Sequence, residues 1–365
     1  MSDLNETRKK INNIDKQMAQ LFVERMQASK DVAIYKMEHG LPIYDRIREE
    51  EVINKNSSLV EDSNIRKYYV NFLKDLMNVS KQYQSELISG LKVGYSGVEG
   101  AFGHIAAIKM FNNAQYMSYP DFERAYAACE KGECDIVVLP IENSYAGDVG
   151  AVMDLVFSGS LYINQMIDLD VNHNLIACED ATKDTIKKVY SHPQALAQCN
   201  EYLSLNGYQV EEYPNTAIAA KMVAEKNDPS IACIAAIDTA EIYNLKVIES
   251  NINASRNNTT RFAAFSRVQN MPTPTAKMGE HFILVFTVLN EAGSLAKTLN
   301  IIGSYGFNMR TLRSRPMKEL QWNYYFFVEL DGNINSPDGK DMINELRSVC
   351  DRLKIVGTYY SFKER

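Results

Sequence analysis

The 365-residue sequence has no apolar run approaching the ~20 residues that a membrane-spanning helix needs, and its first ten residues are polar. We therefore expect neither a membrane span nor a secretory signal. Its six cysteines never form a CxxC pair and are scattered along the chain, which predicts buried thiols in a reducing compartment. These absences together predict a cytoplasmic protein with no membrane partner.

Positive charge and metal-binding patterns are scarce as well. Lys and Arg number 39 against 46 Asp and Glu, and the net charge of −7 argues against a nucleic-acid partner, although not against local cationic pockets. The five histidines show no metal spacing such as HExxH, so we expect no metal. The glycines from Gly94 to Gly100 are spaced GxxGxxG rather than GxGxxG, which gives no support for a nucleotide cofactor.

Length and pattern divide the chain into three predicted domains, at residues 1–89, 91–268 and 280–365. A chain of this length is too long for one ordinary core, and 45% hydrophobic with 23% charged residues is typical of globular proteins. The first domain reads as all helix. The second alternates strands and helices, which predicts a two-lobed α/β architecture with a mostly parallel sheet. The third has the strand and helix order βαββαβ of a ferredoxin-like unit.

The first predicted helix spans residues 4–37 and is about 50 Å long. Two shorter helices, beginning near residue 45 and spanning residues 63–87, cannot cover it alone, so we expect dimerisation through the long helices. The apolar positions expected to face inward are, on the first helix, Ile11, Ile14, Met18, Leu21, Ala28 and Val32, and, on the third, Ile65, Tyr69, Phe72, Leu76, Val79 and Tyr83.

Arg25 and Lys36 lie on the apolar side of the first helix, eleven residues apart and so on one side after about three turns. One interpretation is that long side chains reach from the edge of the core to water. The other is that they hold an anion inside the helical bundle, because buried cations are rare without a partner.

Three motifs in the middle domain stand beside strand-like runs: Pro140-Ile141-Glu142-Asn143-Ser144, Ser191-His192-Pro193-Gln194 and Asn258-Thr259-Thr260-Arg261-Phe262. Strand ends of an open α/β sheet are where small ligands bind. Ser191 could also serve only as the cap of a following helix.

These three motifs resemble those of prephenate dehydratases, and with the flanking domains the whole chain resembles the bifunctional chorismate mutase/prephenate dehydratases. The resemblance implies conversion of chorismate to prephenate and of prephenate to phenylpyruvate, without a cofactor, in phenylalanine biosynthesis. The glycine spacing from Gly94 to Gly100 argues against the competing fusion, of the mutase with a nicotinamide-dependent dehydrogenase.

For the mutase, the resemblance implies a set of carboxylate, hydroxyl and ether contacts. Lys36 and Gln84 would donate to the ether oxygen, and Glu49 would accept from the ring hydroxyl. The other substrate-binding positions are Arg8 (from the partner subunit), Arg25, Asp45, Arg48 and Ser80. Arginine suits carboxylates because it binds them with two parallel hydrogen bonds.

For the dehydratase, the resemblance implies that Thr260 assists departure of the substrate hydroxyl. Glu142 could be a protonated acid or could orient Asn143. The implied substrate contacts are Asn143, Ser144, Ser191, Gln194, Arg261 and Phe262. Gly103 stands where the family usually has serine, which weakens the substrate contact implied there.

The last domain resembles the regulatory ACT domain, which binds phenylalanine between subunits. The implied effector residues form two motifs, Gly293-Ser294-Leu295-Ala296 and Arg313-Ser314-Arg315-Pro316. Arg313 replaces the usual glutamate and reverses the charge there. Feedback regulation in a homodimer or homotetramer is the implied behaviour, and a purely structural dimerisation role is the alternative.

A different class of protein also fits part of the pattern: an amino-acid-responsive binding protein with a two-lobed ligand module and a degenerate helical dimeriser. Such a dimeriser would not need the mutase-type polar residues. Because these residue types are all in place, the sequence favours the enzyme.

Overall fold

The computed structural model describes residues 4–38, 46–112, 114–254, 258–269, 278–317 and 323–362. The chain divides into a helical unit, residues 1–92 with 113–115, and a larger α/β unit, residues 93–112 and 116–365. None of the described helices is both long and apolar enough to cross a membrane.

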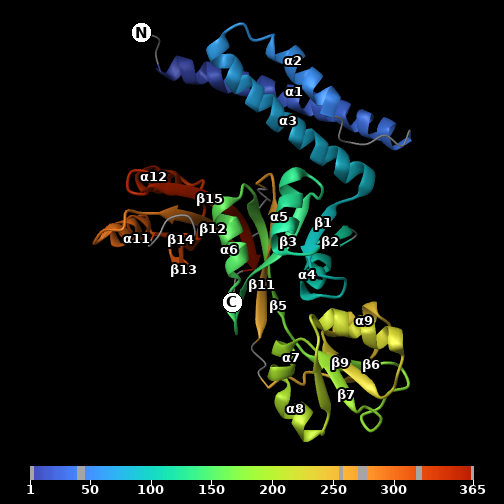
Figure 1. The fold of residues 1–365 in the computed structure, drawn as a ribbon. Coiled ribbons are helices and arrows are strands. Elements are labelled where there is room, and N and C mark those ends of the chain that lie inside the picture. The colour runs from blue at the N-terminus through green and yellow to red at the C-terminus, as the bar shows by residue number, and fades with distance from the viewer. Residues whose placement is uncertain are drawn as a thin grey trace. The chain divides into compact units, whose positions relative to one another are not determined.

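The helical unit consists of α1 (Leu4–Glu38), α2 (Arg46–Ser57) and α3 (Ser63–Ser89), and Figure 1 shows α1 and α3 packed along each other. The three predicted helices are confirmed. Asp62 begins α3 as its N-cap, because its carboxylate accepts a hydrogen bond from the backbone N–H of Asn64 at 2.8 Å.

Within a single chain the predicted inward positions are exposed on α1, whereas Tyr69, Leu76, Val79 and Tyr83 of α3 are half-buried. The buried side of α1 carries Ser29 and Ala33, whereas the predicted positions from Ile11 to Val32 are exposed. On α3 the buried residues include Leu73 and Met77, and Ile65 and Phe72 are exposed. The small residues face α3 because they allow the helices to approach closely, and a second, apolar face of α1 is left uncovered.

The first lobe of the α/β unit is built on the sheet order β5-β11-β3-β1-β2. Its strands are β1 (Lys92–Ser96), β2 (Gln115–Tyr119), β3 (Ile136–Asn143), β4 (Gly147–Asp148), β5 (Tyr162–Asp170) and β11 (Thr259–Ser266). Its helices are α4 (Phe102–Met110), α5 (Phe122–Lys131) and α6 (Gly150–Ser158).

The second lobe has its own five-stranded sheet in the order β10-β6-β9-β7-β8. These strands are β6 (Asn174–Ala177), β7 (Lys188–Ser191), β8 (Gln209–Glu212), β9 (Ile231–Ala235) and β10 (Lys246–Glu249). Its helices are α7 (Pro193–Gln198), α8 (Asn200–Leu205), α9 (Thr216–Lys226) and α10 (Ile237–Ile242).

The two-lobed α/β architecture agrees with the prediction, but the expectation of a mostly parallel sheet is wrong. Parallel pairs such as β1 with β3 and β7 with β9 lie beside antiparallel pairs of β11 with β3 and β5 and of β6 with β9. The reason is that the chain leaves the first lobe along β5 and returns along β11. The returning strand runs antiparallel to its neighbours (Figure 1).

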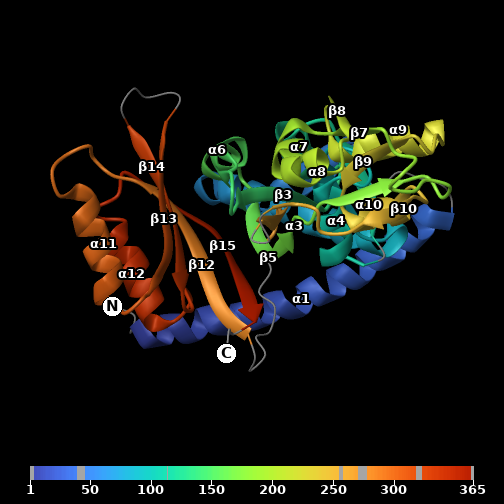
Figure 2. The same cartoon turned by 90° about the horizontal axis from the view of Figure 1, so that it is seen from below.

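The C-terminal subdomain, residues 278–362, has the predicted βαββαβ order. It consists of β12 (Met278–Thr287), α11 (Ser294–Ser304), β13 (Met309–Pro316), β14 (Tyr324–Asp331), α12 (Pro337–Leu346) and β15 (Arg352–Phe362). Its antiparallel sheet runs β13-β14-β12-β15, the ferredoxin-like order, and α11 and α12 lie together on one face (Figure 2).

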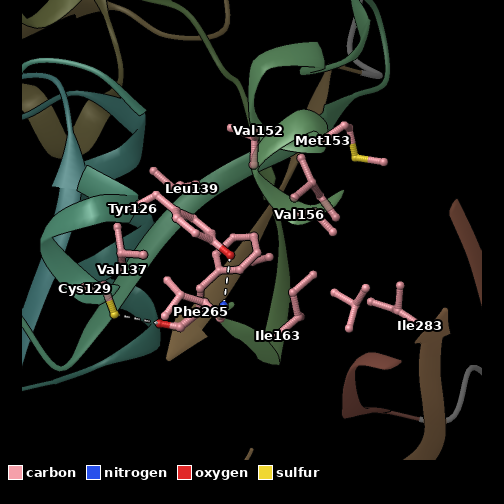
Figure 3. Close-up of a cluster of buried hydrophobic side chains, with 14 of the residues drawn as sticks. Tyr126, Cys129, Val137, Leu139, Val152, Met153, Val156, Ile163, Phe265 and Ile283 are labelled. Atoms are coloured by element: carbon pink, nitrogen blue, oxygen red, sulfur yellow. Dashed lines mark hydrogen bonds between the residues drawn. The ribbon is translucent and has the colours of Figure 1, made fainter. Parts of the chain in front are cut away.

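The same subdomain continues the sheet of the first lobe, because Gly357 of β15 pairs in parallel with Ile163 of β5. A Cβ on Gly357 would lie 2.0 Å from the Ile163 carbonyl oxygen, so the strands can meet only at glycine. The main core of the α/β unit packs side chains of α5 and α6 against β3, β5 and β11 (Figure 3), and Ile283 of β12 belongs to it. Five of the six cysteines are buried free thiols, as predicted, and Cys350 is half-buried.

Candidate active sites

The helical unit brings together three of the residues predicted for the mutase site. Arg25 of α1 donates through Nη1 to the Ser80 hydroxyl of α3 and to the Leu76 carbonyl oxygen at 3.5 Å. Ser80 in turn donates to that carbonyl at 2.8 Å. Gln84 is buried one turn further along α3, and within the described structure its Oε1 has no hydrogen-bond partner. Burial lowers the pKa of Arg25, as expected for a cation that leaves water.

The other predicted mutase residues are not joined to this cluster by the described contacts. Arg8 is exposed on α1, and 17 residues separate it from Arg25, about 25 Å along a helix. It cannot reach the Arg25 cluster within one chain. Lys36 lies on α1, and Arg48 and Glu49 lie on α2, but their side chains are outside the described part. Asp45 lies outside the described residues.

The α/β unit contains a cavity of about 440 Å³ lined by both lobes. The first lobe contributes the end of β1, the start of α4, Asn143 of β3, and Thr260 and Phe262 of β11. The second contributes His192, Gln194 and Gln198 around α7 and residues 214–216 at the start of α9. Among the described lining residues there is no Asp, Glu, Lys or Arg.

A hydrogen-bond network in this cavity begins at Asn143, whose orientation is set by the backbone. Its Oδ1 accepts from the N–H groups of Tyr145 and Ala146 at 3.0 and 2.8 Å. Its Nδ2 must therefore donate, and it lies 2.9 Å from Thr260 Oγ1 and 2.8 Å from Asn258 Oδ1. Because Thr260 Oγ1 accepts this bond, its own proton is not donated to Asn143.

The same network continues to a histidine and fixes its tautomer. Asn258 Nδ2 donates to Gln198 Oε1 at 3.1 Å, which identifies this atom as the amide oxygen. The oxygen can only accept, so His173 Nε2, 2.8 Å away, must donate to it. His173 therefore carries its proton on Nε2, and burial lowers its pKa and keeps it neutral. Its Nδ1 is buried and, in the described structure, has no hydrogen-bond partner.

Sequence reasoning missed Gln198 and His173. Gln198 could have been found from its spacing of four from Gln194, which places both on one helix face. His173 precedes β6 and carries no motif, so only the tertiary structure reveals it.

Glu142 and Arg261 are predicted site residues that the structure places away from the cavity. Arg261 makes a two-pronged ion pair with Asp168, with Nε–Oδ1 2.8 Å and Nη2–Oδ2 3.2 Å, and its Nη1 lies 3.6 Å from the buried Glu329. Asp168 raises the pKa of Arg261. Glu142 accepts from Arg313. Side chains alternate along a strand, so the face that presents Thr260 and Phe262 to the cavity cannot also present Arg261.

Ser144 and Ser191 also lie outside the cavity lining. Ser144 Oγ accepts from the Thr259 N–H at 2.9 Å, and Ser191 is buried and donates to the Ile234 carbonyl at 2.7 Å. The expected cap role of Ser191 is wrong, because it ends β7. His192 caps α7 instead, through Nδ1. Gly103 lines the cavity, and a Cβ there would lie 3.0 Å from the Ser96 carbonyl oxygen, leaving little room for serine.

The predicted effector motifs lie on α11 and β13. Gly293 is the left-handed N-cap of α11, and Ser294, Leu295 and Ala296 form its first turn. Arg313 and Arg315 point from β13 toward the first lobe, where Arg313 pairs with Glu142 and Asp148 and Arg315 with Asp154. Ser314 and Pro316 are exposed on the other face of the strand.

The fold and the cavity define an α/β protein with a cavity between two lobes and an all-helical unit that holds a half-buried arginine. The family model for prephenate dehydratase matches residues 93–270, and that for chorismate mutase type II matches residues 7–85. The chain belongs to the prephenate dehydratase family, and it is a bifunctional chorismate mutase/prephenate dehydratase.

Two similar sequences and one solved structure of similar fold are given as examples. A bifunctional chorismate mutase/prephenate dehydratase of Buchnera aphidicola is 29% identical over 98% of this chain and 96% of its own length. An arogenate dehydratase/prephenate dehydratase of Arabidopsis thaliana is 30% identical over 74% and 72%. The crystal structure of the Arthrobacter aurescens prephenate dehydratase in complex with L-Phe superposes with a TM-score of 0.66, at 24% identity over 74% and 89%.

Proposed function

We propose that the helical unit rearranges chorismate through a site built on the Arg25–Ser80–Gln84 cluster. Chorismate carries two carboxylates and rearranges without an enzyme nucleophile, so the site has to hold a compact conformer and stabilise charge on the ether oxygen. Arg25 and Arg48 bind carboxylates, together with Arg8 of the partner subunit. Lys36 and Gln84 donate to the ether oxygen, Glu49 accepts from the ring hydroxyl, and Asp45 and Ser80 complete the site.

The unsatisfied Oε1 of the buried Gln84, beside the half-buried Arg25, supports a ligand inside this bundle, because buried polar groups normally have partners. The uncovered apolar face of α1 supports a homodimer, which a dimer of dimers would extend to a tetramer. A dimer would also provide the second Arg8 that the distance along α1 requires.

In the cavity, Thr260 assists departure of the prephenate hydroxyl while the ring carboxylate leaves as carbon dioxide. One proton is consumed, because the hydroxyl departs as water. The observation that carries this role is the hydrogen bond from Asn143 Nδ2 to Thr260 Oγ1, which uses the oxygen as an acceptor and leaves the threonine proton available to a ligand. Asn143, Gln194 and Phe262 contact the substrate. Glu142, Ser144, Ser191 and Arg261 act from outside the cavity and do not contact the substrate.

We infer further that the C-terminal subdomain is an ACT regulatory domain that binds phenylalanine and lowers dehydratase activity. The ferredoxin-like order and the glycine-led start of α11 support this assignment. The ion pairs of Arg313 and Arg315 with the first lobe offer a physical connection between an effector site and the dehydratase. The scattered buried thiols fit a reducing cytoplasm.

The test is a coupled assay in which purified protein receives chorismate, and prephenate and phenylpyruvate are followed separately with and without phenylalanine. Both products, with phenylpyruvate suppressed by phenylalanine, are the expected result. Prephenate without phenylpyruvate would refute the dehydratase roles. Phenylpyruvate formation that is insensitive to phenylalanine, together with no heat of binding, would refute the regulation.

A further inference from the structure

The cavity has to accommodate a substrate with two carboxylates, yet the described residues that line it include no arginine or lysine. Arg261, the cation that the sequence suggested for this task, is on the far face of β11 and paired with Asp168. Among the described lining residues, the positive potential offered to an anion therefore comes from N–H groups and not from a lysine or arginine. This deduction rests on the proposed dehydratase function.

The starts of two helices face the cavity from opposite lobes. α4 begins after Ala101, which has no side-chain cap, and Ala101, Phe102 and Gly103 all line the cavity. α9 begins after Asn215, and residues 214–216 line it from the other lobe. Both helices exceed two turns, with 9 and 11 residues. Free N–H groups and the dipole make such helix ends favourable for anions.

The buried His173 is an independent sign that a ligand completes this cavity. His173 is a lining residue, only 3% exposed, and the directed network above leaves its Nδ1 as an acceptor without a described partner. A buried acceptor of this kind is satisfied by a bound hydroxyl or other donor. Prephenate carries one hydroxyl in addition to its two carboxylates, so it matches both kinds of group.

We propose that the carboxylates of the substrate are bound by the N-termini of α4 and α9. The cavity then selects small dicarboxylates through backbone N–H groups held rigidly on two lobes. Thr260 and the side-chain amides of Asn143, Asn258 and Gln198 lie between the two helix N-termini, where they interact with the substrate hydroxyl.

The sharpest test is Asn215→Asp, because it changes charge and almost nothing else. Asn215 Oδ1 caps α9 by accepting from the Ala217 N–H at 2.7 Å, and aspartate is an equally good cap. The helix is therefore retained, while a negative charge is placed at the proposed carboxylate site. We expect KM for prephenate to rise about tenfold or more, corresponding to ~1.4 kcal/mol, and the mutase rate to stay unchanged.

A matched pair tests α4 in the same way. Ala101→Asn and Ala101→Asp both supply a cap and differ only in charge, so a larger KM increase is expected for the aspartate. Ser336→Asp is the control for the added charge itself. Ser336 caps α12 in the C-terminal subdomain, where it accepts from the Gly339 N–H at 3.0 Å, and it is not a cavity residue. KM of this variant should equal that of the wild type.

Two outcomes would overturn the proposal. One is an equal KM for Asn215→Asp and the wild type, measured on protein with normal dehydratase turnover. The other is a large KM increase for Arg261→Gln with none for Asn215→Asp, which would assign the carboxylate to arginine. If the wild type forms no phenylpyruvate at all, the proposed function itself fails, and this result is distinct from both. Calorimetric titration of prephenate into Thr260→Ala, with and without Asn215→Asp, reports binding without turnover.

Discussion

Arg313 Nε lies 3.0 Å from Asp148 Oδ1, so a residue of the C-terminal subdomain is ion-paired with the short hairpin that follows Asn143. The same guanidinium donates to Glu142, and its side chain is only 11% exposed. Because Asn143 orients Thr260, this pair connects β13 to the dehydratase site through two consecutive residues of β3. The connection depends on Arg313, which stands where this effector motif usually has glutamate.

Arg313→Glu should therefore weaken the α/β unit and impair the dehydratase. Removing one partner of a mostly buried ion pair costs about 3 kcal/mol, and the new charge also repels Glu142 and Asp148. We expect denaturant unfolding to show this loss, with a several-fold lower dehydratase kcat and an unchanged mutase rate. The double variant Arg313→Glu with Glu142→Arg should recover part of both. Full stability in the single variant would contradict the role of the pair.

Thr260→Ala should nearly abolish phenylpyruvate formation, by about a thousandfold in kcat, because it removes the hydroxyl that Asn143 orients. The mutase reaction, measured as chorismate consumption by the same preparation, should be unaffected. Thr260→Ser retains Oγ and should keep more activity than Thr260→Ala. Equal loss of both reactions would indicate misfolding and would leave Thr260 without a specific role.

Asn143→Asp tests the direction of the hydrogen bonds. The carboxylate still accepts from the Tyr145 and Ala146 N–H groups, but it cannot donate to Thr260 or Asn258. Thr260 would then turn its own proton toward residue 143 and away from the ligand. We expect kcat to fall about a hundredfold with a smaller change in KM. Turnover close to that of the wild type would show that the network does not position Thr260.

Much of the fold could be predicted from periodicity alone, including the three helices and the βαββαβ order. The position of Arg261 could have been predicted as well, because alternation along a strand separates it from Thr260 and Phe262. The motif Thr260-Arg261-Phe262 suggests that all three side chains face the cavity, but the alternation of side chains along a strand allows only two of them to do so. The network that joins Asn143, Asn258, Gln198 and His173 could not be predicted, because its members come from four separate segments that only tertiary folding brings together.

Lys36→Ala should slow the mutase by about 3 kcal/mol in activation free energy, comparable to the loss of an oxyanion-type donor. The dehydratase, assayed with added prephenate, should be unaffected, since the lysine lies on α1 of the helical unit. Lys36→Arg keeps the charge but changes its geometry, so it is expected to recover only part of the rate. A mutase turnover equal to that of the wild type in Lys36→Ala would remove this residue from the proposed site.

Lys354 gives the stability of the α/β unit a predictable dependence on pH. Its ammonium donates to the Val156 carbonyl at 2.8 Å and to the Gly159 carbonyl, and burial lowers its pKa from 10.5 to about 8. A lowered lysine pKa means that the unfolded chain binds more protons between these two values. The penalty for holding the charged lysine is therefore complete below pH 8, and it is relieved as pH rises toward 10.

The measurement is the unfolding free energy of the wild type minus that of Lys354→Met at pH 7 and at pH 9.5. Taking this difference cancels the titration of buried cysteines and tyrosines, which is common to both proteins. The wild type should gain stability relative to the variant over this interval, whichever protein is more stable at pH 7. A difference that stays constant with pH would mean that the two carbonyls compensate fully for burial and that the lysine keeps its ordinary pKa.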